Sequence, residues 1–149
     1  MKANDTIIDK DFEKFCQRNS YIPSQNFYNF YNKFFKLCKS YGVFENGPYC
    51  WFHGGETEAV ANANLFGTGN TLTKTGGVTH TPIMGIKPNG TTGYLDTGVN
   101  PSTDTIFTQN DCQIISVIRD NIAEQAIDVG FGTASNGGWL SSRWNDDKC

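Results

Sequence analysis

Apolar residues in the first third of the chain recur at spacings of three and four, which is typical of an amphipathic helix. In the segment SQNFYNFYNKFFKLCKSYG these positions are Phe27, Phe30, Tyr31, Phe34, Leu37, Cys38 and Tyr41. Gly42 follows the last of them, and glycine readily takes the left-handed conformation just past a helix end. The pattern predicts a helix that ends just before Gly42, with Lys33, Lys36 and Lys39 toward its opposite side.

A shorter helix is predicted upstream, where Phe12, Phe15 and Cys16 follow Asp9. Pro23 separates it from the longer helix. The face of the longer helix is too aromatic to stay in water, so it must pack on the rest of the chain or on a neighbour. We therefore expect residues 1–45 to form a helical docking segment. The residues expected to mediate docking are Phe27, Phe30, Tyr31, Phe34 and Leu37.

After Gly42 the apolar pattern changes to short runs separated by turn residues. Tyr94 to Gly98 favours a short strand, Cys112 to Ile118 a buried strand, and the segments around Phe131 and Trp139 two more. Turn clusters such as KPNG, NPSTD and ASNGG lie between them. Because no helical pattern intervenes, we expect an antiparallel β-sandwich over residues 46–149.

The segment NGTTGYLDTGVNPS raises the question of a phosphate-binding or metal-binding loop. The Gly67–Gly77 segment before it lacks the glycine spacing of a dinucleotide loop, and the chain has no G-K-S/T of a Walker loop. Asn89-Gly90 suits a tight turn, Gly98 allows an unusual backbone angle, and Asn100-Pro101 ends a strand. We interpret the segment as turn, strand and turn.

Composition narrows the class of protein. A length of 149 residues suits one domain plus an arm, and 11 Phe, 6 Tyr and 3 Trp with only 18% charged residues argue against disorder. The net charge of −3 gives no basic stripe, so nucleic acid is not an expected partner. No apolar run reaches the length of a membrane span, and the N-terminus lacks the apolar core of a signal peptide.

The five cysteines are widely spaced and odd in number, so we expect buried or idle thiols and no disulfide framework. Cys50, His53, His80 and Cys112 could in principle supply four zinc ligands. Their spacing is not one that structural zinc sites use, and we expect no metal and no cofactor. Nor does the Cys50–His53 pair predict a nucleophile and its base.

Two carboxylates at alternate positions, Glu56 and Glu58, raise the alternative of a sugar-degrading enzyme. No third acidic residue completes the run found in jelly-roll glycosidases, so a solvated turn is the simpler interpretation and no catalytic residue is expected. Strand aromatics can also serve as stacking platforms for sugars. The residues considered for this binding role are Tyr94, Trp139 and Trp144.

The order of these segments resembles a family of bacteriophage structural proteins that carry a concanavalin-like, LamG-type jelly-roll domain. The similar segments are YNKFFKLCKSYGVFE, FHGGETEAVANANLFG, MGIKPNGTTGYLDTGVNPST and TQNDCQIISVIRDN. The matching positions are Gly90, Tyr94, Leu95, Thr97, Gly98, Asn100, Pro101, Thr108, Gln109, Asn110, Asp111, Arg119 and Asn121. The glycines that follow His53 depart from the family pattern, so no role is transferred to His53.

The resemblance implies a mainly β, antiparallel jelly-roll sandwich behind the helical segment, either incomplete or completed by a partner, since family members continue through further strands. It also implies a non-enzymatic protein of a tail fibre, baseplate appendage or particle surface. The expected partners are other virion proteins and further copies of the chain, with the protein assembled in the host cytoplasm and located on the virion. The alternative is a lectin-like module that binds a host-surface glycan.

Overall fold

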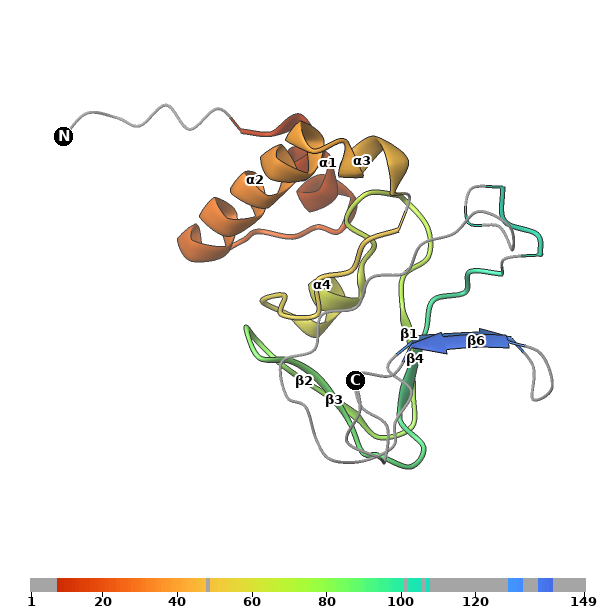
Figure 1. Ribbon diagram of the computed structural model, residues 1–149. Helices are drawn as coiled ribbons and strands as arrows, with labels where there is room; N and C mark the ends of the chain where they lie inside the picture. The colour runs from red at the N-terminus through yellow and green to blue at the C-terminus, as the bar shows by residue number, and fades with distance from the viewer. Residues whose placement is uncertain are drawn as a thin grey trace, which may run out of the picture. The chain divides into compact units, whose positions relative to one another are not determined.

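The computed structural model describes residues 8–47, 49–100, 102–105 and 107, together with the backbone of residues 129–132 and 137–140. The chain divides into two compact units, Met1–Asn110 and Asp111–Cys149. Figure 1 labels the helices and strands in chain order. The helices and the aromatic core belong to the first unit.

The first unit begins with two helices, α1 (Lys10–Arg18) and α2 (Gln25–Ser40). The side chain of Asp9 caps α1 by accepting hydrogen bonds from the backbone N–H groups of Asp11 and Phe12. Past the end of α2, Gly42 has a φ of 67°, which is the left-handed conformation expected of a helix stop. Both helix predictions are confirmed.

Two short helices follow, α3 (Val43–Asn46) and α4 (Glu58–Asn62). The hydroxyl oxygen of Thr57 caps α4 by accepting a hydrogen bond from the N–H of Val60. This cap holds Val60 and Ala61 on the buried side of α4. The helix thereby joins the core that α1 and α2 form.

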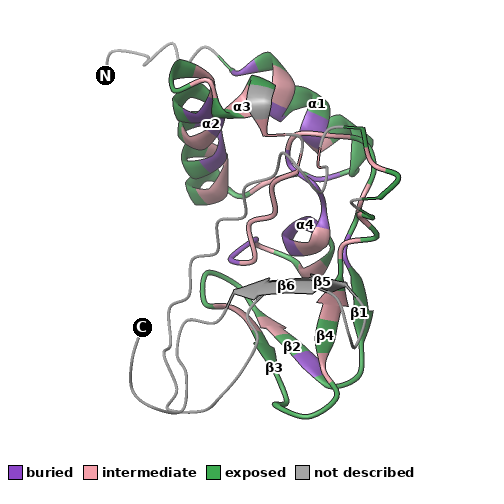
Figure 2. Cartoon of the chain, turned by 45° about the vertical axis from the view of Figure 1, so that its right-hand side comes forward, coloured by how far each residue is buried: buried purple, intermediate pink, exposed green. Residues whose placement is uncertain are grey.

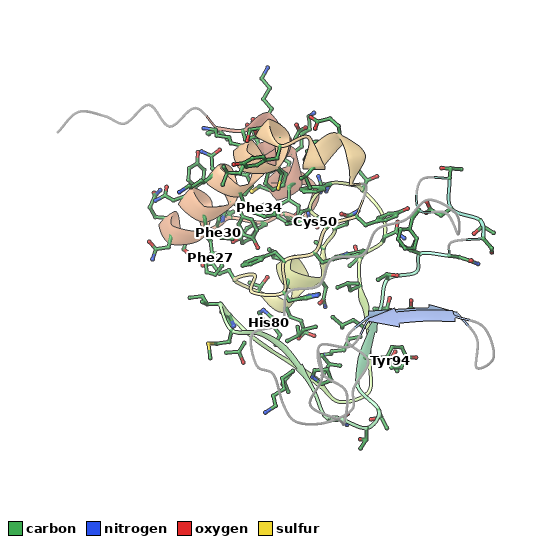
Figure 3. All side chains as sticks on the ribbon, viewed as in Figure 1. Phe27, Phe30, Phe34, Cys50, His80 and Tyr94 are labelled. Atoms are coloured by element: carbon green, nitrogen blue, oxygen red, sulfur yellow. The ribbon has the colours of Figure 1, made fainter. Side chains whose placement is uncertain are left out.

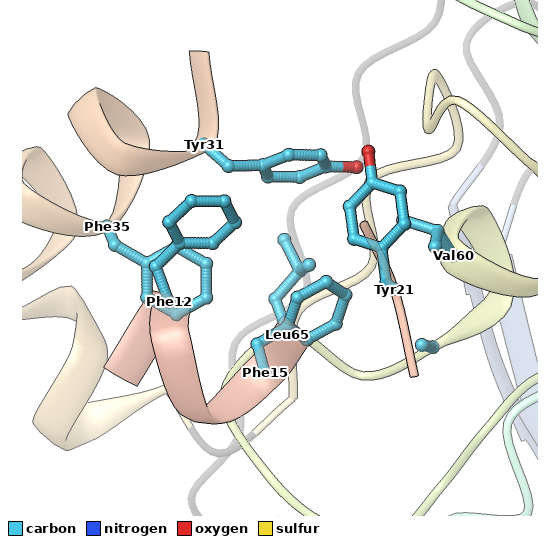
Figure 4. Packing of buried hydrophobic residues seen from close by; sticks show 8 residues of the cluster. Phe12, Phe15, Tyr21, Tyr31, Phe35, Val60 and Leu65 are labelled. Carbon is cyan, nitrogen blue, oxygen red and sulfur yellow. The ribbon is translucent and has the colours of Figure 1, made fainter. Parts of the chain in front are cut away.

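Half of the residues in this core are aromatic rings from α1 and α2 (Figure 4), and Figure 2 shows buried positions on both helices. Its buried residues are Phe12, Phe15, Tyr21, Tyr31, Phe35, Val60, Ala63 and Leu65. The ring of Tyr31 stacks on that of Phe12 at 5.8 Å between centroids. Core residues come from both sides of residue 45, where we expected a boundary between the docking segment and the sandwich.

The strands are short and pair in twos. Strand β1 (Thr73–Thr75) pairs with β4 (Tyr94–Asp96), and β2 (Val78–Thr81) pairs with β3 (Gly85–Pro88), both antiparallel. In the second unit β5 (Val129–Gly132) pairs with β6 (Gly137–Leu140), also antiparallel. The strand expected from Tyr94 onward is present and ends at Asp96.

The predicted mainly β jelly-roll sandwich is wrong. In the described part of the chain, strands of three or four residues form two-stranded sheets only, and the largest element is the helix α2. A sandwich needs two sheets with apolar inner faces. Strand β1 is exposed at every position and β4 is exposed at Tyr94 and Asp96, so this pair has no such face. The apolar residues gather instead between the helices.

Several expectations lie outside the described residues. They concern the strand from Cys112 to Ile118, the TQND segment, Arg119, Asn121, Trp144 and the side chain of Trp139. The backbone of Trp139 lies on β6, opposite Gly130 of β5.

Candidate functional site

One side of α2 carries an apolar stripe that the rest of the described chain leaves partly uncovered. The stripe consists of Phe30, Phe34, Leu37 and Tyr41, whose spacings of four, three and four residues place them on one helical face. Phe30 is 41% exposed, Leu37 44% and Tyr41 79%. We call this set the α2 stripe.

Ring contacts hold the stripe against the core. The Phe30 ring lies 4.7 Å from that of Phe52 and 6.1 Å from that of Phe34, and Phe34 stacks on Phe66 at 6.4 Å. Figure 3 shows Phe27, Phe30 and Phe34 along one side of α2. The part of the stripe around Phe30 and Phe34 is therefore rigid, since each of these two rings packs on a half-buried ring.

The five predicted docking residues do not share one environment. Tyr31 is fully buried among the core rings, which makes it a core residue of this chain. Phe27 and Phe34 are half-buried against the core. Phe30 and Leu37 are the two whose side chains reach solvent to the greatest extent.

The turn between β2 and β3 extends the apolar surface and was missed by the sequence reasoning. Ile83 and Met84, at this turn, are 75% and 51% exposed. The N–H of Ile83 donates to the carbonyl of Gly54 at 3.1 Å, and a Cβ on Gly54 would lie 2.9 Å from the ring of Phe52. The turn thus lies beside the ring that supports Phe30. The apolar run Pro82-Ile83-Met84 between two turn signals could have revealed it.

A basic side chain borders the stripe. Lys33 follows Phe30 by three residues and precedes Leu37 by four, so it projects next to both on the helix surface. Its side chain is exposed. A surface of this kind fits a partner with apolar residues flanked by acidic ones.

Tyr94, the one proposed sugar platform whose side chain is described, is 56% exposed on β4 and lies opposite Thr75 of β1. The NGTTG loop before it is ordered by Asn89, whose side-chain oxygen accepts hydrogen bonds from three backbone N–H groups. These come from Thr91, Thr92 and Gly93. The turn expected at Asn89-Gly90 is present, and the Asn89 side chain organises it.

Glu56 and Glu58 are engaged in separate interactions. Glu56 accepts hydrogen bonds from the backbone N–H of Ser24 at 3.0 Å and the hydroxyl of Tyr21 at 2.7 Å, and these lower the pKa of its carboxyl group. Glu58 forms an ion pair with Lys74. A general acid in glycoside hydrolysis needs a raised pKa, so the shift of Glu56 runs against that role. Glu56 lines an open depression of about 470 Å³ beside Tyr21 and Ile22.

Burial holds the described cysteines in their thiol form. It raises the pKa of Cys50 to about 12 and that of Cys16 to about 11, and it also raises the pKa of Cys38. The thiolate is the nucleophile and the metal ligand, so these three side chains fit the expected structural role.

The side chains of His53 and His80 are both half-buried. Burial, with a smaller contribution from nearby His80, lowers the pKa of His53. Among the described residues, no group of three or more His, Cys, Asp and Glu side chains gathers as a metal-ligand set.

Comparisons with protein-family models, with curated proteins and with solved structures found no match to this chain. The likeness to phage structural proteins therefore depends on the order of the sequence segments alone. None of the helices in the described part of the chain has the length and apolar character needed to cross a membrane.

Proposed function

We propose that this chain is a non-enzymatic docking protein whose α2 stripe binds an apolar, acid-flanked helix of another protein in a virus particle. The observation that carries the proposal is the exposure of Phe30 and Leu37 on a rigid aromatic surface. Exposed apolar patches on stable helices are typical of interaction surfaces. The particle setting comes from the order of the sequence segments that resemble phage structural proteins.

The chemistry of the partner follows from the shape and charge of the stripe. Its residues recur at helical spacing over three turns, which matches the spacing of a second helix packed alongside. Lys33 at its border would pair with an acidic residue of the partner. In a helix-in-groove contact, the partner would present apolar residues at every third or fourth position.

The test compares purified particles from cultures that make either the unchanged protein or a variant with Phe30→Asp and Leu37→Asp. Immunogold labelling should detect the unchanged protein on the particle and no longer detect the variant. Tyr94→Asp is the matched control, because Tyr94 is 56% exposed but lies on β4, away from α2. Circular dichroism of each variant establishes that it is folded.

Two results would contradict the proposal. Particles that carry the double variant at the normal level would show that the α2 stripe is not the docking surface. If the unchanged protein is found only free in the lysate, the particle setting is wrong.

Carbohydrate binding is a second candidate, favoured by the exposed ring of Tyr94. A glycan array probed with the full chain and with Tyr94→Ala tests it. The Tyr94→Ala variant should lose binding, and an unchanged chain that binds no glycan would remove this candidate.

A further inference from the structure

Ile83, at the turn between β2 and β3, combines an exposed apolar side chain with a backbone angle that isoleucine rarely adopts. The turn is closed by the N–H of Met84, which donates to the carbonyl of Thr81 at 3.1 Å. Pro82 is its second residue, and Ile83, its third, has a φ of 68°. A turn of this pattern normally has glycine or asparagine at the third position, because a side chain branched at Cβ is strained at positive φ. The chain therefore has isoleucine where glycine would suit the turn better.

Burial of the side chain does not offset this strain. Ile83 is 75% exposed and Met84 is 51% exposed, so neither side chain gains much from packing within the described part of the chain. Residues that depart from a local conformational preference without a gain in stability are typical of functional sites. An exposed apolar side chain at such a position indicates contact with another molecule.

Contacts at Gly54 place this turn beside the α2 stripe. The N–H of Ile83 donates to the carbonyl of Gly54 at 3.1 Å. A Cβ on Gly54 would lie 3.1 Å from the carbonyl oxygen of Ile83 and 2.9 Å from the end of the Phe52 ring. The centroid of the Phe52 ring lies 4.7 Å from that of Phe30. Figures 1 and 2 both show the β2–β3 turn below the N-terminal end of α2. The turn and the stripe therefore lie side by side.

The charged side chains that α2 and the hairpin contribute to this surface are basic. Neither α2 nor the segment 59–95, which includes the hairpin, contains Asp or Glu. Lys33 follows Phe30 by three residues on α2, and Lys87 follows Ile83 by four residues on β3. Both lysines are exposed, and neither forms an ion pair within the described part of the chain. Acidic residues of a partner would supply the missing counter-charges.

We propose that Ile83 and Met84 form one docking surface together with the α2 stripe, and that an apolar helix with acidic flanks occupies both parts of it. This inference rests on the proposed function, because the occupant is the same helix. It adds that Ile83 is an anchor of the contact, since only binding buries its side chain. Acidic residues on the flanks of the helix meet Lys33 and Lys87.

Peptide binding to the full chain tests the proposal. The probe is a synthetic, fluorescently labelled helical peptide with leucine at every third or fourth position and glutamate along both flanks. The control peptide has lysine in place of glutamate. Fluorescence anisotropy should detect tighter binding of the glutamate peptide than of the lysine peptide. Phe30→Asp with Leu37→Asp should abolish binding. Ile83→Asn should weaken it by at least about tenfold, the loss expected when one isoleucine side chain is no longer buried.

Thermal unfolding distinguishes a lost contact from a lost fold. Asparagine adopts a positive φ more readily than isoleucine, so Ile83→Asn should leave the Tm unchanged or raise it while it weakens binding. Ile22→Asn is the matched control, because Ile22 is 92% exposed, has no positive φ and lines the depression beside Glu56. This control should change neither the Tm nor the binding of the peptide.

A charge reversal tests the acidic flanks of the partner. Lys33→Glu with Lys87→Glu should reverse the preference, so that the lysine peptide binds more tightly than the glutamate peptide. An unchanged preference would show that these two lysines do not meet the flanks of the helix.

Three further outcomes would overturn the proposal. Normal binding by Ile83→Asn, with binding abolished by the Phe30 and Leu37 substitutions, would show that the stripe binds the helix alone, and the proposed function would stand. Equal binding of the two peptides would show that the surface does not select an acidic partner. Binding of neither peptide to the unchanged chain would show that the occupant is not an apolar helix. Immunogold labelling decides the proposed function separately, because it detects the protein on the particle whatever the partner is.

Discussion

Lys39, in the last turn of α2, places its Nζ 2.7 Å from Oδ1 of Asp9, the residue that caps the start of α1. The same ammonium group lies 2.6 Å from Oδ2 of Asp11. The backbone N–H of Asp9 also donates to Oδ1 of Asn32 on α2, at 2.7 Å. One lysine therefore ties the first turn of α1 to the end of α2, and the aromatic core lies between the same two helices.

Replacing this lysine tests how much the tie stabilises the fold. Lys39→Met keeps the length of the side chain and removes its charge, which leaves Asp9 with only 9% exposure and no cation from the described residues in contact. Hydrogen bonds to charged groups contribute about 1.5–3 kcal/mol, and we expect the free energy of unfolding to fall by about that amount. Urea denaturation measures it. Lys33→Met, on the exposed side of α2, is the control and should change stability by less than about 0.5 kcal/mol.

The same tie predicts how stability changes with pH. The hydrogen bond from Lys39, and next the one from Lys14, lowers the pKa of the Asp11 carboxyl group below 3.8. The ionised carboxylate of Asp11 therefore stabilises the folded protein above that pH, and this contribution is lost as the pH falls. Burial alone would lower the pKa of Lys39, but the hydrogen bonds to Asp11 and Asp9 raise it above 10.5. The stabilisation from Lys39 is therefore present below that pH and is lost as the pH rises.

Urea unfolding at about pH 3, 7 and 11 should give the greatest stability at the middle value. The difference in stability between the unchanged protein and Lys39→Met isolates the contribution of the tie from that of every other titrating group. This difference should be largest near neutral pH and shrink at both ends. A difference that is constant across the range would show that the ion pairs contribute no net stability.

The helices could be predicted from the sequence, because their signals are local. Asp9 before an apolar run specifies a cap, and Gly42 after one specifies a stop. The buried face of α2 was harder to predict, because apolar residues cover more than half of its circumference. The apolar residues of α2 that are buried in the structure are Tyr31, Phe35 and Cys38. The apolar face predicted from the sequence included Tyr31 and Cys38 but not Phe35. Which of two apolar stripes faces inward depends on the rest of the fold.

The sequence also could not show whether the predicted strands form a sandwich, because this too depends on the rest of the fold. Turn residues and β-branched residues specify hairpins, but they do not specify how many hairpins join into one sheet. The Tyr94 strand was predicted, whereas its partner Thr73–Thr75 was not, because TKT carries no apolar alternation.

A pair of glycines tests the tight turn that joins β1 to β2. Gly76 and Gly98 have φ angles of 66° and 65°, so alanine at either position is strained by about 1–2 kcal/mol. At Gly76 the new Cβ would also collide with the carbonyl of Thr92, whereas at Gly98 nothing lies within 4 Å. Gly76→Ala should therefore lower the free energy of unfolding more than Gly98→Ala does. Equal effects would show that the approach of the β1–β2 turn to Thr92 is absent in solution.

Two tyrosines in the core provide the last prediction, because they differ in what their hydroxyl groups contact. The hydroxyl of Tyr21 donates to Glu56, whereas the buried hydroxyl of Tyr31 has no hydrogen-bond partner among the described residues; Figure 4 shows both rings. Tyr21→Phe removes a hydrogen bond to a charged group and should lower the free energy of unfolding by about 1.5–3 kcal/mol. Tyr31→Phe removes an unsatisfied polar atom from the interior and should leave stability unchanged or raise it by up to about 1–3 kcal/mol. Thermal and urea unfolding of the two variants measure the contrast, and a loss of stability in Tyr31→Phe would show that this hydroxyl has a partner, such as a bound water molecule, in solution.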